Sequence, residues 1–194
     1  MCLRNAKMFF VNKPTKCYKV LLTDGTDLFM SPHQHEIYKL GETKRAEGKE
    51  EILMYKPADF IVVSSEEGKL GIKRDTRTWL EVGCGYLHVC ESLMDAFSYV
   101  QSSWNPSEYS DICKKWVIVE CEIPTGSETY RGAWEDEDVY CYATKALEVK
   151  RPLLLDEVIE NLKNDGFYVQ PDGWILESFK SKYYVPGQCV ENEL

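Results

Sequence analysis

The order of apolar and polar positions in the first half of the chain predicts antiparallel β-strands. Residues 16–23 alternate and then become continuously apolar, which is typical of a strand. The dipeptide Asp24-Gly25 that follows is a turn signal, so we expect residues 26–30 to return as the hairpin partner. The apolar run 60–63 predicts a buried strand, and residues 70–74 are its expected return strand after a Glu-Glu-Gly-Lys turn.

The second half contains one well-signalled helix between strands. Ser92 followed by Asp95 resembles a capping box, and apolar residues then recur at helical spacing up to Val100. Residues 116–123 predict a strand whose odd-numbered positions face the core. Residues 140–150 predict the last long strand of the main body, with period-2 alternation along its whole length.

Past Pro152 the pattern changes. An apolar stripe at helical spacing from Leu155 to Leu162 predicts a helix that ends at Asn164-Asp165-Gly166. Residues 167–177, centred on a Pro-Asp-Gly turn, predict a hairpin. We therefore divide the chain into a main domain, 1–152, and a C-terminal helix-plus-hairpin appendage, 153–194.

The expected fold class is α+β. Hairpin signals outnumber crossovers of helical length, which favours a mostly antiparallel sheet, curved or split, with a few short helices.

Composition narrows the classes of function. The chain has 194 residues, and 23 Lys and Arg stand against 32 Asp and Glu, for a formal net charge of −9. Binding to nucleic acid or to an anionic membrane rests on a surplus of basic residues, so we expect neither partner. No apolar run has the length of a membrane span or a signal peptide, and we expect a cytoplasmic protein. Its eight cysteines then read as reduced thiols.

The stretch from Gly83 to Cys90 is the strongest candidate for a site. A turn with two glycines presents Tyr86 and His88 just before the predicted helix. Cys84, His88 and Cys90 are an alternative set of zinc ligands, but a structural site needs a fourth ligand, so packed thiols are favoured and no metal is expected. His33 and His35 have no accompanying cluster of ligands and read as part of a solvated loop.

The order of several short motifs resembles a family of small uncharacterised domains common in bacteriophage and bacterial genomes. The shared pattern covers about residues 17–160. Its motifs in this chain are Tyr18-Lys19, Tyr38-Lys39-Leu40-Gly41, Gly85-Tyr86-Leu87-His88-Val89-Cys90, Asp95 with Tyr99, Val119-Glu120, and Leu147-Glu148-Val149 running to Leu153. One additional residue, Leu87, separates the aromatic residue from the histidine. This resemblance implies a protein that works inside a bacterial host cell.

The stretch from Cys84 to Tyr99, followed by the stretch from Val117 to Ile123, also resembles the ADP-ribosyltransferases in a weaker way. That resemblance implies an ADP-ribosyltransferase-like core with NAD as cofactor. It further implies catalytic roles for Glu148 and His88 and cofactor contacts from Tyr18, Lys19 and Tyr86. In such a site a carboxylate stabilises the cationic ribose that forms when the nicotinamide bond breaks. The His or Arg that this family usually carries on its first strand is missing here, where only Lys19 stands.

Two functions of different classes follow. The first is an ADP-ribosyltransferase-like domain that binds NAD or a related nucleotide, with or without turnover, so the sequence leaves open whether the protein is an enzyme. The second is a non-enzymatic phage-type accessory protein that binds a host or phage protein. A deep pocket lined by Tyr86, His88 and Glu148 would favour the first. An exposed apolar patch near Trp174 and residues 183–184 would favour the second. The oligomeric state stays open.

Overall fold

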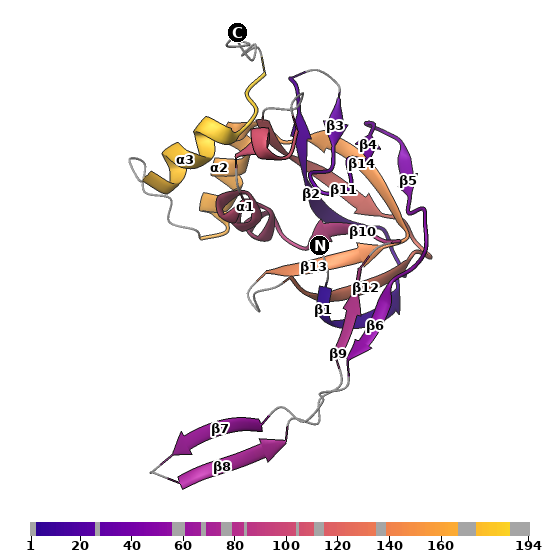
Figure 1. The fold of residues 1–194 in the computed structure, drawn as a ribbon. Helices are drawn as coiled ribbons and strands as arrows, with labels where there is room; N and C mark the ends of the chain where they lie inside the picture. Colours follow the sequence, from indigo (N-terminus) through magenta and orange to yellow (C-terminus); the bar gives the residue numbers. More distant parts are fainter. Residues whose placement is uncertain are drawn as a thin grey trace.

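The computed structural model describes residues 3–25, 28–55, 61–66, 69–74, 79–83, 85–103, 105–110, 115–134, 139–166 and 174–186. The fold is α+β, as the sequence predicts: a mostly antiparallel sheet with short helices (Figure 1). Within the described chain, no helix combines the length and the apolar character needed to cross a membrane.

Twelve strands form the main sheet. Their bounds are β1 Leu3–Phe10, β2 Thr15–Thr23, β3 Phe29–Met30, β4 Ile37–Tyr38, β5 Thr43–Arg45, β6 Ile52–Tyr55, β9 Trp79–Val82, β10 Leu87–Cys90, β11 Lys115–Ile123, β12 Glu128–Trp134, β13 Tyr140–Thr144 and β14 Ala146–Pro152. The main path runs β5-β14-β11-β2-β10-β13-β12-β1-β9-β6, and β3 and β4 join it at the edge of β2. The sheet is strongly curved (Figure 1).

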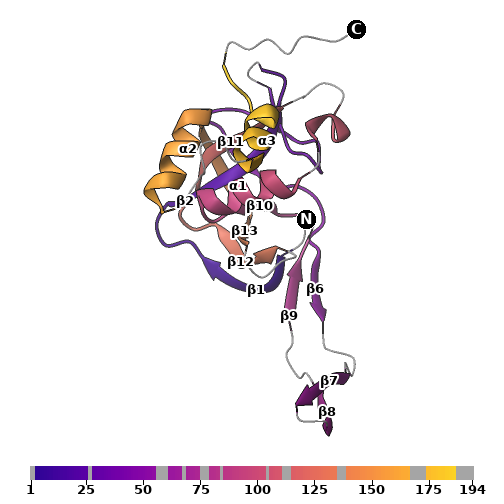
Figure 2. The same cartoon turned by 90° about the vertical axis from the view of Figure 1, so that its left-hand side faces the viewer.

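Three helices, α1 Leu93–Ser102, α2 Leu155–Asn164 and α3 Trp174–Lys182, lie together on one side of the described sheet (Figure 2). A turn of 3₁₀ helix, Pro106–Glu108, follows α1. The capping box predicted for α1 is present: the Ser92 hydroxyl accepts from the Asp95 N–H, and the Asp95 carboxylate accepts from the Ser92 N–H. This pairing satisfies two donors that the first turn of a helix leaves open.

The pair β2–β11 is the centre of the structure. It is antiparallel and in continuous register from Thr15↔Ile123 to Thr23↔Lys115. Trp116 and Ile118 belong to the core beneath the helices, whereas Val117 and Val119 belong to a second core on the opposite face. Burial on both faces explains why both strands read as apolar runs rather than as a simple alternation.

Two strands differ from the sequence expectation. Residues 8–11, for which no strand is predicted above, belong to or directly follow β1, which pairs with β12. The predicted strand 140–150 is two strands that meet at Lys145. The first pairs with β10 and β12 and the second with β11 and β5, so the chain changes partners at this residue.

The C-terminal region contains the helix predicted over residues 155–162, but the predicted hairpin is wrong. Residues 174–182 are the helix α3, because Leu176, Phe179 and Tyr183 fall on one buried helical face. Residues 167–173 lie outside the described part of the chain. Phe179 and Tyr183 share the core of α1 and the sheet, so the boundary drawn at residue 152 does not separate two cores.

Strands β7 Ile61–Glu66 and β8 Lys69–Arg74 form the second predicted hairpin. They pair with each other in a separate two-stranded sheet. In both views this hairpin stands apart from the main sheet (Figures 1 and 2).

Candidate functional site

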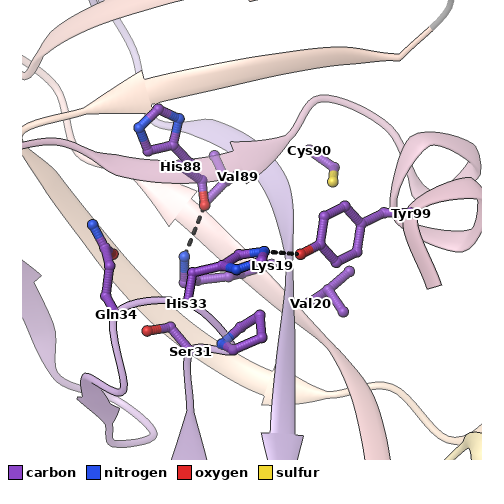
Figure 3. A pocket seen from close by; sticks show the side chains of 10 residues that line it. Lys19, Val20, Ser31, His33, Gln34, His88, Val89, Cys90 and Tyr99 are labelled. Atoms are coloured by element: carbon purple, nitrogen blue, oxygen red, sulfur yellow. Dashed lines mark hydrogen bonds between the residues drawn. The ribbon is translucent and has the colours of Figure 1, made fainter. Parts of the chain in front are cut away.

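A small cavity lies at a break in the sheet beside β2. Strand β10 pairs with β2 only at Cys90↔Tyr18, and β3 pairs with β2 from Leu22 onward. Among the described strands, residues 19–21 therefore have no partner on that edge. The cavity measures about 50 Å³ and is lined by Lys19, Val20, Ser31, Pro32, His33, Gln34, His88, Val89, Cys90 and Tyr99 (Figure 3).

Lys19 supplies the charge of this site. Only 6% of the residue is exposed, and its Nζ donates to the carbonyl oxygen of His88 at 2.8 Å. The ammonium also lies 5.0 Å from the centroid of the Tyr38 ring. Within the described part of the chain, no carboxylate pairs with Lys19. Burial of an ammonium without a counter-charge costs several kcal/mol, so this arrangement needs an explanation.

The wall opposite Lys19 is made by α1 and by the loop after β3. The Tyr99 hydroxyl and Nε2 of His33 share a hydrogen bond of 2.9 Å. Burial raises the pKa of the Tyr99 hydroxyl, which therefore stays protonated. The loop itself is closed by a backbone bond from the Ser31 N–H to the Glu36 oxygen, and the Ser31 hydroxyl accepts from the Glu36 N–H. The loop thus holds Ser31 and His33 at the cavity.

His88 contributes its backbone rather than its ring. Its carbonyl oxygen points to Lys19, and the imidazole points away from the cavity (Figure 3). The ring is buried; Nε2 donates to the Gly83 oxygen at 3.0 Å, and Nδ1 has no hydrogen-bond partner in the structure described here. Burial lowers the pKa of His88 to about 4, so the ring is neutral at pH 7.

Tyr86 belongs to a different cluster. Its hydroxyl donates to Oε1 of Glu128 at 2.8 Å, and the Lys145 ammonium lies 3.9 Å from the centroid of its ring. Lys145 also donates to the Gly85 oxygen and pairs with Glu50 at 2.6 Å. A more open cavity of about 310 Å³ is lined by Glu128 and Lys145, but Tyr86 does not line it. Only 1% of Tyr86 is exposed, so the residue presents almost no surface to a ligand.

Tyr18 and Glu148 lie elsewhere on the sheet. Adjacent positions of a strand face opposite sides, and β2 is continuous, so Tyr18 faces the helices while Lys19 faces the second core. Glu148 pairs with Lys150 at 2.7 Å on β14. Strands β11 and β2 lie between β14 and β10, so Glu148 and His88 are on strands that are not neighbours.

The structure thus brings together Lys19 and the backbone of His88, and it does not bring Tyr18, Tyr86 or Glu148 to them. Of these five residues, only Lys19 and His88 line the cavity beside β2. Tyr99, His33 and Ser31 were not predicted as members of the site. The sequence carries no signal that unites them, because the loop and the helix are 66 residues apart where they meet.

The residues chosen to discriminate between the two functions lie in different parts of the fold. The cavity is not lined by Tyr86 or Glu148. Tyr183 is fully buried and Tyr184 is half-buried, so neither forms an exposed apolar patch. The side chain of Trp174 lies outside what the structure describes. Among the described residues no group of three or more His, Cys, Asp or Glu is placed to hold a metal ion, and Cys84 of the alternative zinc set is not among them.

We compared the chain with family models, curated proteins and solved structures. No protein-family model, no curated protein and no solved structure matches the chain.

Proposed function

We propose that this protein binds a small ligand through an anionic group and that Lys19 holds that group in the cavity beside β2. One observation carries the proposal: a buried ammonium faces a cavity with a carbonyl and an aromatic ring as its partners and no carboxylate within the described chain. A ligand anion would supply the missing counter-charge. A charge-assisted hydrogen bond to such a group is about twice as strong as one between neutral groups.

The size of the cavity limits what enters. About 50 Å³ corresponds to about four water molecules, which is enough for a carboxylate or a single phosphate group. The body of the ligand would then lie outside, against the exposed side chains of His33 and Gln34. NAD or a related nucleotide is the ligand class that the resemblance predicts, and in this proposal one phosphate of the nucleotide occupies the cavity.

The proposal contains no transfer step. Transfer of ADP-ribose needs a carboxylate beneath the ribose, and Glu148 is engaged with Lys150 three strands away. The ring of Tyr86 is covered by Lys145 and leaves no face for nicotinamide. Ligand binding without turnover is the reading that these contacts support.

The test is a thermal-shift and calorimetric titration with phosphate, acetate, ADP-ribose and NAD. A ligand at 100 times its dissociation constant stabilises the folded state by about 2.7 kcal/mol, which raises the midpoint by roughly 5–10 °C for a chain of this size. In Lys19→Met the shift should disappear. That variant should remain folded, because an apolar side chain of similar length removes a buried charge.

The matched control is Lys16→Met. It makes the same change of net charge on the same strand, but Lys16 is exposed and pairs with Glu120 at 2.8 Å on the other face. Its titrations should match those of the wild type. Binding that survives in Lys19→Met, or no shift with any of the four anions, would overturn the proposal.

The hairpin β7–β8 favours a second candidate function, the binding of a host or phage protein. A two-stranded hairpin is at best marginally stable in water, and this one shares no strand pairing with the main sheet. Contact with a partner would stabilise it. Tyr55 and Trp79 are register partners, so replacing residues 56–78 by Asn-Gly should close a short hairpin there. The shortened protein should keep its thermal midpoint and should not bind a partner that the full chain captures from bacterial lysate. If the full chain and the shortened protein both capture that partner, this candidate function is rejected.

A further inference from the structure

Four cysteines form two pairs that face each other across neighbouring strands. Cys90 of β10 stands opposite Cys141 of β13, and Cys17 of β2 stands opposite Cys121 of β11. All four are free thiols, and none is more than 4% exposed. The first pair belongs to the core beneath the helices and the second to the core on the other face.

The backbone around Cys90 and Cys141 suits a disulfide. The Glu91 N–H donates to the Tyr140 oxygen at 3.0 Å, which makes the two cysteines a pair without direct backbone hydrogen bonds between them. Cα atoms in such a pair are about 4.5 Å apart, within the range of about 4.4–6.8 Å found across disulfides. A bond between them therefore needs no change of strand register.

The two pairs differ in their access to small molecules. Cys90 lines the cavity beside β2, where its side chain lies next to Tyr99 (Figure 3). Neither Cys17 nor Cys121 lines either of the cavities described above. A molecule of the size of a few waters can thus reach the first pair, whereas Cys17 and Cys121 are buried in the opposite core and line neither cavity.

We propose that Cys90 and Cys141 are a modification site that forms a reversible disulfide with a small peroxide as oxidant. The neighbouring Cys141 thiol and burial raise the pKa of Cys90, so the reaction begins with loss of the Cys90 proton. The resulting thiolate attacks one peroxide oxygen, the O–O bond breaks and a sulfenic acid forms. The other oxygen takes up the proton that Cys90 lost and leaves as water. The Cys141 sulfur then attacks the Cys90 sulfur, and the hydroxyl leaves as a second water with the Cys141 proton. Two thiols lose two electrons to one hydrogen peroxide, and a dithiol reductant reverses the change.

The disulfide would tie β10 to β13 at the end of the ligand cavity. Strand β10 carries the His88 carbonyl that holds the Lys19 ammonium. Cytosolic disulfides are usually transient and act in redox sensing, which is the role that this position fits.

The experiment treats the folded wild-type protein with hydrogen peroxide, blocks the remaining thiols under denaturing conditions, and digests without reductant. Chymotrypsin cuts after aromatic residues and leucine, so it separates Cys90 from Cys84 and Cys113 in the sequence. Mass spectrometry should find the Cys90–Cys141 peptide pair, and dithiothreitol should remove it. Cys17 and Cys121 should carry the blocking label and serve as the matched control pair.

Two further arms test the role of the cavity. A bulky disulfide reagent such as oxidised glutathione should leave the pair reduced under conditions in which peroxide oxidises it. In Cys141→Ala the cross-linked peptide should be absent and Cys90 should accumulate as sulfenic acid, which dimedone traps when the oxidised protein is unfolded in its presence. Failure of peroxide to link the pair, or equal oxidation of both pairs in the folded protein, would overturn the proposal.

Discussion

The buried ring of His88 predicts a specific dependence of stability on pH. Protonation would place an N–H at Nδ1, which has no acceptor in the described structure, and the pKa of the ring is lowered to about 4 chiefly by burial. In the unfolded chain the ordinary pKa of histidine is about 6.5. As the pH falls, the unfolded chain therefore takes up the proton first, and the folded state loses stability between about pH 6.5 and pH 4.

The size of the loss follows from the two pKa values. A difference of about 2.5 units corresponds to about 3 kcal/mol once the pH is below both values. About 2 kcal/mol of this is already lost at pH 5, where most carboxylates are still ionised. Above about pH 7 the contribution of His88 is complete and should not change further.

Urea unfolding of the wild type and of His88→Gln at pH 7.5 and pH 5.0 checks this. Glutamine can keep a donor to the Gly83 oxygen and cannot take up the proton, so any constant cost of the substitution cancels between the two pH values. The wild type should lose about 2 kcal/mol more than the variant. Equal losses in the two proteins would refute the reasoning, as would a His88 resonance that titrates near pH 6.5 by NMR.

Two further predictions concern stability, with urea unfolding as the common measurement. Tyr183→Phe removes a buried hydroxyl that accepts from the Ile118 N–H of β11 and donates to the Leu153 oxygen after β14, and it should cost about 2–3 kcal/mol. Tyr184→Phe loses one partly buried contact of 3.3 Å and should cost less than about 1 kcal/mol. Equal costs would show that the hydroxyl of Tyr183 does not anchor the end of α3. Gly85→Ala should cost at least about 2 kcal/mol, because φ is +81° and the added carbon would lie 2.8 Å from a backbone oxygen. Gly126→Ala has φ of +82° with open space around it and should cost about 1 kcal/mol, and a similar cost for both would exclude the backbone contact as the cause.

The local sequence determined those elements whose buried face appears as a regular apolar repeat. Strand β11 and helix α1 are where the sequence predicts them, because an apolar face repeats with the period of the element and Ser92 closes the helix start. The α+β class follows for the same reason, since closely spaced hairpin signals leave little room for helical crossovers.

Where the local sequence fits two different secondary structures, tertiary contacts decided which one forms. The Pro-Asp-Gly signal before residue 174 predicted a hairpin, but the residues after it are a helix because Phe179 and Tyr183 complete the core of α1. The break at Lys145 is equally invisible in the sequence. It arises because the chain leaves the partners of β13 for those of β14, and an alternating pattern does not record a change of partner.

The candidate site depended almost wholly on tertiary structure. The sequence singled out Lys19 and His88, but only strand register and the gap between β10 and β3 bring the ammonium of one to the carbonyl of the other. The sequence alone determined the elements with a clear apolar period, such as β11 and α1, because each of these records its own burial. Only the tertiary structure decided which side chains meet, because strand order and register arise from pairing between residues far apart in the chain.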